Sequence, residues 1–166
     1  MKRHGRNRCS EGHPADIPGL VQCAAGLFAE DSGTRDKTID AEWPAKQAAQ
    51  RFSETISDPA RLVLAARHAA DVIGSLSGVL EATTAMRLIR VATLTSIYVY
   101  LPYRRSGVGA RLWNKFRAWA QEMNATRIAV TGHTPRTLQP SASTGALHSC
   151  HTPLRWRRAL RRAGYR

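Results

Sequence analysis

The chain has 166 residues, of which 43% are hydrophobic and 22% charged, a size and composition typical of one globular domain. Its 25 Lys and Arg residues outnumber 12 Asp and Glu, giving a formal net charge of +13. No apolar run is long enough to cross a bilayer, and the basic start lacks the apolar segment of a secretory signal, so we expect a cytoplasmic protein with no membrane partner.

The positive charge is concentrated at the two ends of the chain. Residues 1–13 carry a net charge of +3, residues 14–131 carry +3, and residues 132–166 carry +7. A basic tail is able to bind nucleic acid, but the long central part is nearly balanced, so the sequence does not favour a nucleic-acid partner. Three widely separated cysteines indicate reduced thiols rather than a disulfide framework.

The first predicted elements are two helices that follow an irregular basic start. Residues 1–12 show no alternation of apolar and polar side chains, so a strand there is either missing or disguised. Apolar residues at helical spacing predict a helix over residues 14–30, which Asp31-Ser32-Gly33 ends. A second helix is predicted over residues 39–57, and Asp58-Pro59 closes it.

Three strands are predicted next. Leu62–Ala66 and Val72–Leu80 are joined by a polar segment, which predicts a β-hairpin. Leu88–Val99 is rich in β-branched and aromatic residues and predicts a long third strand that completes a meander.

A basic glycine turn joins this third strand to the next helix. Glycine has no Cβ, so Gly107 and Gly109 allow a tight turn whose N–H groups approach an anion closely, and the following helix adds its positive dipole end. That helix is indicated by an apolar stripe from Val108 to Met123, and a short strand, Arg127–Val130, comes after it. The pattern predicts a phosphate-binding loop, although the turn by itself is equally compatible with an ordinary tight turn beside solvated arginines.

This order of strand, Arg-x-x-Gly-x-Gly turn, helix and strand resembles the acetyl-CoA-binding core of the GNAT family of N-acetyltransferases. The family motif (Q/R)-x-x-G-x-(G/A) matches Arg104 to Gly109, and the resemblance covers about residues 14–131. It implies an α/β fold with a mixed, mostly antiparallel central sheet flanked by helices. The chain departs from the family at Leu101, where a proline is common and where Pro102 follows instead.

The resemblance also implies a function. It predicts an N-acyltransferase that uses acetyl-CoA as acyl-donor cosubstrate and passes the acetyl group directly to a primary amine. The acceptor stays open between a small amine, an antibiotic, an amino acid and a protein N-terminus. A homodimer also stays open, because dimers are common in the family.

Site residues follow from the same resemblance. The coenzyme would be bound by the glycine turn through its pyrophosphate and by the long strand through its pantetheine arm, where a backbone N–H would also stabilise the oxyanion. The residues predicted to bind the coenzyme are Ile97, Val99, Arg104, Arg105, Ser106, Gly107, Val108, Gly109 and Ala110. Glu81, at the end of the second predicted strand of the meander, is the candidate general base, although a solvated residue at a hairpin end is the simpler interpretation.

The family's acceptor site lies near the two N-terminal helices. By the resemblance, Glu30, Asp31 and Asp36 are candidates to attract a cationic amine, but a solvated acidic helix end is the preferred interpretation of each. Tyr98 and Tyr100 lie on the long strand, and neither occupies the family's usual position for the acid that protonates the leaving thiolate.

The sequence after residue 131 does not follow the family pattern. It lacks the family's Asn-x-x-Ala-x-x-(F/L)-Tyr helix and Gly-Phe strand, and its composition is typical of low-complexity coil. Back-translation of residues 136–149 in another register permits Asn-Pro-Ala-Ala-Val-Arg-Leu-Tyr, so we hypothesise a frameshift from about Gly132. The alternative function is therefore a catalytically impaired coenzyme-A-binding remnant. No metal site is predicted, because the cluster at residues 148–151 does not match zinc spacing.

Overall fold

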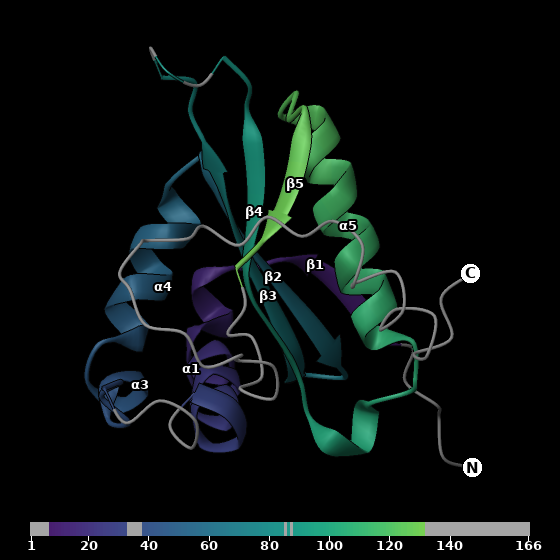
Figure 1. Ribbon diagram of the computed structural model, residues 1–166. Coiled ribbons are helices and arrows are strands. Elements are labelled where there is room, and N and C mark those ends of the chain that lie inside the picture. The colour runs from purple at the N-terminus through teal and green to yellow at the C-terminus, as the bar shows by residue number, and fades with distance from the viewer. Residues whose placement is uncertain (1–6, 33–37, 85, 87, 132–166) are drawn as a thin grey trace, which may run out of the picture. The chain divides into compact units, whose positions relative to one another are not determined.

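A five-stranded sheet lies at the centre of the computed structural model, which describes residues 7–32, 38–84, 86 and 88–131 (Figure 1). Its strands follow one another in chain order, and neighbours are antiparallel except for the last pair, which is parallel. The strands are β1 (Arg8–Glu11), β2 (Arg61–His68), β3 (Asp71–Glu81), β4 (Val91–Val99) and β5 (Arg127–Val130).

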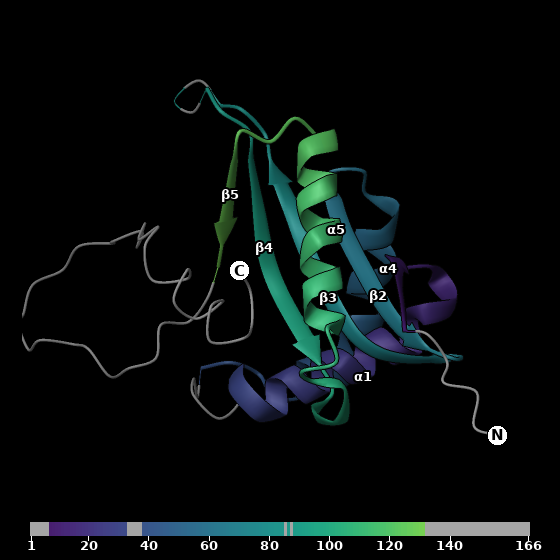
Figure 2. The same ribbon diagram turned by 90° about the vertical axis from the view of Figure 1, so that its right-hand side faces the viewer.

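Helices cover both faces of the sheet (Figures 1 and 2). One face carries α1 and α4, with the short α3 beside them, and the other carries α5. Their bounds are α1 (Ile17–Leu27), α3 (Trp43–Lys46), α4 (Ala48–Ser57) and α5 (Val108–Glu122). Short helical turns are η1 (Pro14–Asp16), the π-helical η2 (Phe28–Ser32) that continues α1, and η3 (Leu101–Tyr103). The mixed α/β fold predicted from the sequence is thereby confirmed.

Alternation along the strands divides the core between the two faces. On β2, Leu62 and Leu64 pack toward α5, where Phe116 is fully buried. Val63 points to the opposite face and packs against Leu20 of α1. Burying a side chain such as Phe116 contributes about 1.5–3 kcal/mol, so the α5 face holds that helix, and the loop before it, firmly on the sheet.

Strand β4 has two different edges. Along its β3 edge it is paired from Val91 to Val99, with a bulge that leaves Thr95 as an extra residue. Along its other edge it pairs with β5 only from Val91 to Leu94, and the Thr131 N–H donates to the Leu94 carbonyl at 3.0 Å. Beyond that point, no strand within the described residues pairs with Thr95–Val99 on this side (Figure 2).

The predicted hairpin, the helix after the glycine turn and the final strand are all present. Of the two alternatives for residues 1–12, a missing or a disguised strand, the structure shows the second, because Arg8–Glu11 pairs with β2. This short edge strand shows no apolar alternation because its side chains are only partly buried. It is fixed by tertiary contacts that no local pattern reveals.

Two element boundaries also differ from the prediction. The single helix predicted over residues 39–57 is two helices, α3 and α4, separated at Gln47, whose backbone φ of −131° is not helical. The long strand begins at Val91 rather than Leu88, whose side chain is 85% exposed. The predicted strand starts too early because the β3–β4 connection that precedes Val91 also contains apolar residues.

Candidate active site

The glycine turn lies where the sequence predicts it, between η3 and the first turn of α5. Gly107 caps the helix with a φ of +78°, a left-handed backbone conformation that favours glycine. Crowding is not the reason for glycine here, because a Cβ would lie 3.6 Å from its nearest atom, an ordinary contact distance. The first N–H groups of a helix have no partner within the helix, so Val108, Gly109 and Ala110 present unsatisfied donors at its positive end. The arrangement suits an anion.

The open edge of β4 leads directly into this turn. The Tyr100 N–H donates to the Ile73 carbonyl at 3.1 Å, which sets the alternation along the strand. The backbone groups of Ile97 and Val99 therefore face away from β3, toward the open edge. The structure thus brings the predicted strand residues and the predicted loop residues together in one continuous surface.

Arg104 is held by three groups at the start of the turn. Its Nε donates to the Val99 carbonyl at 2.7 Å, its terminal nitrogen Nη2 contacts the Glu30 carboxylate, and its guanidinium lies 5.5 Å from the centre of the Tyr98 ring. The hydrogen bond from Arg104 lowers the pKa of Glu30, with a further contribution from Tyr98. The charge of Arg104 is thus matched by a carboxylate.

Arg105 differs from its neighbour in both backbone and side chain. Its φ of +69° is uncommon for a residue with a Cβ. Within the described ranges, no hydrogen bond or ion pair engages its side chain, and Arg111 reaches back to the Ser106 carbonyl at 3.5 Å. Arg105 and Arg111 therefore supply the positive charge beside the turn.

Tyr98 of β4 and Tyr100, which follows the end of that strand, both point toward α1. The Tyr98 hydroxyl donates to Glu30 Oε1 at 2.8 Å, and burial together with this hydrogen bond raises the pKa of Tyr98 to about 12. Burial also raises the pKa of Tyr100, whose hydroxyl contacts Cys23 of α1. Both phenols keep their protons at neutral pH, and both hydroxyls are engaged on the α1 side.

Glu81 lies apart from the glycine turn. It ends β3 opposite Val91, at the other end of β4 from Val99, and its carboxylate accepts a hydrogen bond from the buried Thr93 hydroxyl at 2.7 Å. The structure therefore does not bring this candidate base together with the coenzyme-binding residues.

The acceptor-side candidates lie on η2, at the end of α1. Glu30 belongs to the contacts described above, Asp31 is its neighbour, and Asp36 falls outside the described residues. Phe28 of η2 stacks on Trp43 of α3, with ring centres 5.4 Å apart and planes 15° apart. No local pattern indicates that Glu30 meets Arg104, because 74 residues separate them in sequence.

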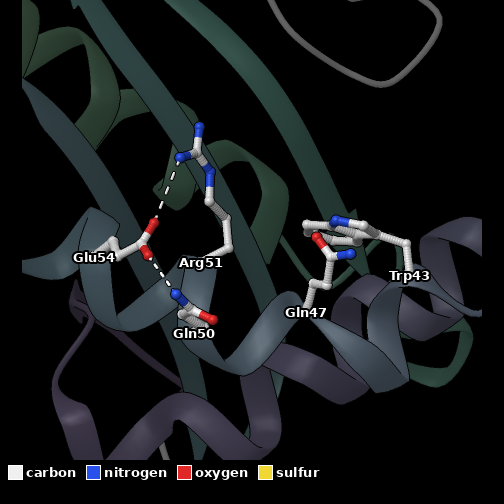
Figure 3. A pocket seen from close by; sticks show the side chains of 5 residues that line it. All are labelled: Trp43, Gln47, Gln50, Arg51 and Glu54. Atoms are coloured by element: carbon white, nitrogen blue, oxygen red, sulfur yellow. Dashed lines mark hydrogen bonds and ion pairs between the residues drawn. The ribbon is translucent and has the colours of Figure 1, made fainter.

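A hollow of about 290 Å³ lies on the outer surface of α3 and α4 (Figure 3). Polar side chains at helical spacing form most of its wall, and Trp43 closes one end beside the Gln47 amide. Gln50 donates to Glu54 at 2.9 Å, and Arg51 lies 3.7 Å from the same carboxylate. These partners are those of an ordinary solvated helix face, so the hollow carries no functional assignment.

The described residues contain neither a metal-binding cluster nor a membrane-spanning helix. Across the described ranges, no group of three His, Cys, Asp or Glu side chains is arranged to hold a metal ion, and the cluster at 148–151 falls outside them. No helix in the part of the chain that the structure describes has both the length and the apolar character needed to cross a membrane. Cys9 and Cys23 are free thiols.

Comparison with known proteins identifies the class. The model of the acetyltransferase (GNAT) family matches residues 28–141, more than half of the chain, and the chain belongs to this family. The class of protein is therefore a GNAT-type N-acetyltransferase. The match extends to residue 141, past the predicted boundary at 131, and no curated protein sequence matches the chain.

Solved structures share the fold at low sequence identity. A transcriptional regulator from Bacillus halodurans C-125 is 16% identical, with a TM-score of 0.62 over 86% of this chain and 99% of that one. A ribosomal-protein-alanine N-acetyltransferase from Brucella melitensis biovar Abortus 2308 is 13% identical, with a TM-score of 0.57 over 88% and 99%. The aminoglycoside N-acetyltransferase AAC(6')-Iy, in complex with CoA, is 11% identical, with a TM-score of 0.65 over 90% and 99%.

Proposed function

We propose that this chain transfers an acetyl group from acetyl-CoA to a primary amine of a still unidentified acceptor. The observation that carries the proposal is the continuous surface formed by the open edge of β4, the glycine turn and the N-terminus of α5. A thioester coenzyme has an extended amide-bearing arm and a pyrophosphate, and these two chemical features match a free strand edge and a helix N-terminus.

Each part of this surface has a role in the proposal. Arg105 to Ala110 donate backbone N–H groups to the pyrophosphate, and Arg105 and Arg111 add positive charge. Ile97 and Val99 pair with the pantetheine arm, and a backbone N–H of this strand edge stabilises the oxyanion that forms when the amine attacks. When bound, acetyl-CoA supplies the activated acetyl group.

The proton of the acceptor amine must be removed before or during attack. Glu81 is the candidate base from the sequence, and its separation from the turn makes a water relay necessary if it acts. The Glu81→Gln variant tests this role. If Glu81 is the base, the variant has a lower kcat and its pH profile lacks the acidic limb. If Glu81 is only a structural partner of Thr93, the variant changes in stability alone.

The proposal is tested with the full chain in two assays. Isothermal titration with CoA measures coenzyme binding, and mass spectrometry of an amine panel that includes aminoglycosides, free amino acids and peptide N-termini measures acetylation. We expect micromolar CoA binding and acetylation of one amine class. Gly107→Val, which forces a β-branched residue into a left-handed backbone, is expected to weaken CoA binding. Absence of CoA binding by the wild-type chain contradicts the proposal.

A second candidate is a coenzyme-binding chain without turnover. The hydroxyls of Tyr98 and Tyr100 are both engaged on the α1 side, so neither is free to protonate the leaving thiolate. CoA binding without acetylation of any amine favours this alternative. Resequencing the gene across the codons for Ala129 to Gly145 then shows whether a base has been gained or lost, and the restored frame is assayed in the same way.

We place the enzyme in the cytoplasm and leave a homodimer open. Sizing by light scattering at the assay concentration decides between one copy and two.

A further inference from the structure

Glu30 and Arg104 join two parts of the chain that lie 74 residues apart in sequence. Glu30 belongs to η2, on the acceptor side, and Arg104 opens the glycine turn. The family motif explains an arginine or glutamine at position 104, but it assigns no partner to that side chain. The carboxylate that faces it is a feature of this chain's own structure.

Each group in this contact is bonded in more than one direction. One oxygen of Glu30 accepts from the Tyr98 hydroxyl and the other from Arg104. Arg104 donates from Nε to the Val99 carbonyl and from a terminal nitrogen to Glu30. The face of its guanidinium lies over the Tyr98 ring. Three elements, η2, β4 and the glycine turn, are thereby fixed to one another.

We propose that Glu30 is a positioning residue for the coenzyme site. It holds Arg104 against the end of the open edge of β4 and so fixes the direction in which the chain enters the glycine turn. The inference rests on the proposed function, because it assigns a role in coenzyme binding. It also gives Arg104 a different role from Arg105: Arg104 orients the loop, and Arg105 meets the anion.

The expected effect is on affinity rather than stability. The Arg104 and Glu30 side chains are 39% and 45% exposed, and ion pairs with this exposure stabilise a fold very little. A loop that is already ordered before binding loses less conformational freedom when the ligand arrives, which strengthens binding. Without Glu30 the protein therefore stays folded, but its glycine turn samples more conformations before binding and loses more conformational freedom when CoA binds.

The experiment measures the Kd of CoA by isothermal titration for the full chain and for Glu30→Gln. Asp58→Asn is the matched control, since Asp58 pairs with Arg61 at a similar exposure, 40% and 33%, outside the candidate site. We expect Glu30→Gln to weaken CoA binding about two- to fivefold with an unchanged unfolding midpoint. The control is expected to bind CoA as the wild type does.

A double-mutant cycle separates a direct contact from a general loss of charge. We expect Arg104→Gln alone and the Glu30→Gln, Arg104→Gln double variant to bind CoA equally weakly, because the second change removes a partner already lost. In an active enzyme, Glu30→Gln is expected to raise the KM for acetyl-CoA and leave kcat unchanged.

Two results overturn the inference. Glu30→Gln binding CoA as tightly as the wild type does so directly. The inference is also overturned if the losses of CoA affinity in the two single variants multiply in the double variant. That result would show that Glu30 acts on the coenzyme without Arg104. A wild-type chain that fails to bind CoA is a different result, and it overturns the proposed function together with this inference.

Discussion

Two arginine–carboxylate pairs each join parts of the chain that are far apart in sequence, and they differ in burial more than in chemistry. Arg67 contacts Asp16 near β1, and Arg104 contacts Glu30 near the open edge of β4. The Arg67 and Asp16 side chains are 23% and 9% exposed, against 39% and 45% for the second pair. The comparison teaches that the same contact stabilises the fold where water is excluded and adds little stability where it is not, which leaves the exposed pair available for the positioning role that we propose.

The first pair is built into the fold. Asp16 accepts from Arg67 Nε and from the His13 N–H, each at 2.7 Å, and Arg67 also donates to the Ser10 hydroxyl of β1. Burial acts to raise the pKa of Asp16, but the hydrogen bonds from Arg67 and His13 outweigh it and lower the pKa. Removal of this carboxylate leaves Arg67 without its charged partner.

The largest expected effect is therefore that of Asp16→Asn. We expect a loss of about 2–4 kcal/mol in the free energy of unfolding at pH 7, because one partner of a largely buried pair is removed. Urea denaturation followed by circular dichroism measures it, with Asp58→Asn as the exposed control. A loss no larger than that of the control contradicts the contrast drawn between buried and exposed pairs.

The pH dependence of this loss is the next test. Since the folded pKa of Asp16 lies below its unfolded value of about 3.9, its contribution is fully present above that value and disappears as pH falls through the folded pKa. The stability difference between wild type and Asp16→Asn is thus constant at neutral pH and shrinks in acid. A difference that stays constant down to pH 2 argues against an ionised Asp16.

Arg105→Gly sharpens the comparison at the exposed site. The left-handed backbone at residue 105 suits glycine, so we expect up to about 1 kcal/mol of added stability, reduced by the flexibility that glycine gives the unfolded chain. CoA binding is expected to weaken, because a positive charge beside the anion is lost. Arg105→Lys, which keeps both the charge and the strain, is the control. If Arg105→Gly raises both the stability and the CoA affinity, or lowers both, the role assigned to Arg105 is wrong.

Tyr98→Phe is expected to have the smallest effect. The ring under Arg104 remains, and only the hydrogen bond to Glu30 is lost. CoA affinity should fall by less than it does in Glu30→Gln. Titration of the two variants side by side checks the order, and a larger loss in Tyr98→Phe shows that the hydroxyl, not the ion pair, holds the turn.

Local pattern was enough to predict the hairpin, the helix after the glycine turn and the loop itself. Each of these depends on neighbours in sequence: β-branched residues in strands, apolar spacing over Val108–Glu122, and Gly107 at a position with positive φ. The contacts that distinguish the two sites could not be predicted. Arg67 meets a carboxylate 51 residues away, and which acid it meets depends on how α1 lies on the sheet.

The bulge in β4 decides which face of the sheet the second half of the strand presents to each helix. Side chains alternate along a strand, so with Leu94 facing α5, the even-numbered residues that follow would face α5 as well. The extra residue Thr95 reverses this parity, and Tyr98 faces α1 instead, beside Gly26, where a Cβ would lie only 2.5 Å from the Tyr98 hydroxyl. Were Thr95 instead paired in a regular ladder, Tyr98 would face α5 and Glu30 would have no phenol to accept from, so a single inserted residue decides which helix the strand's tyrosine meets.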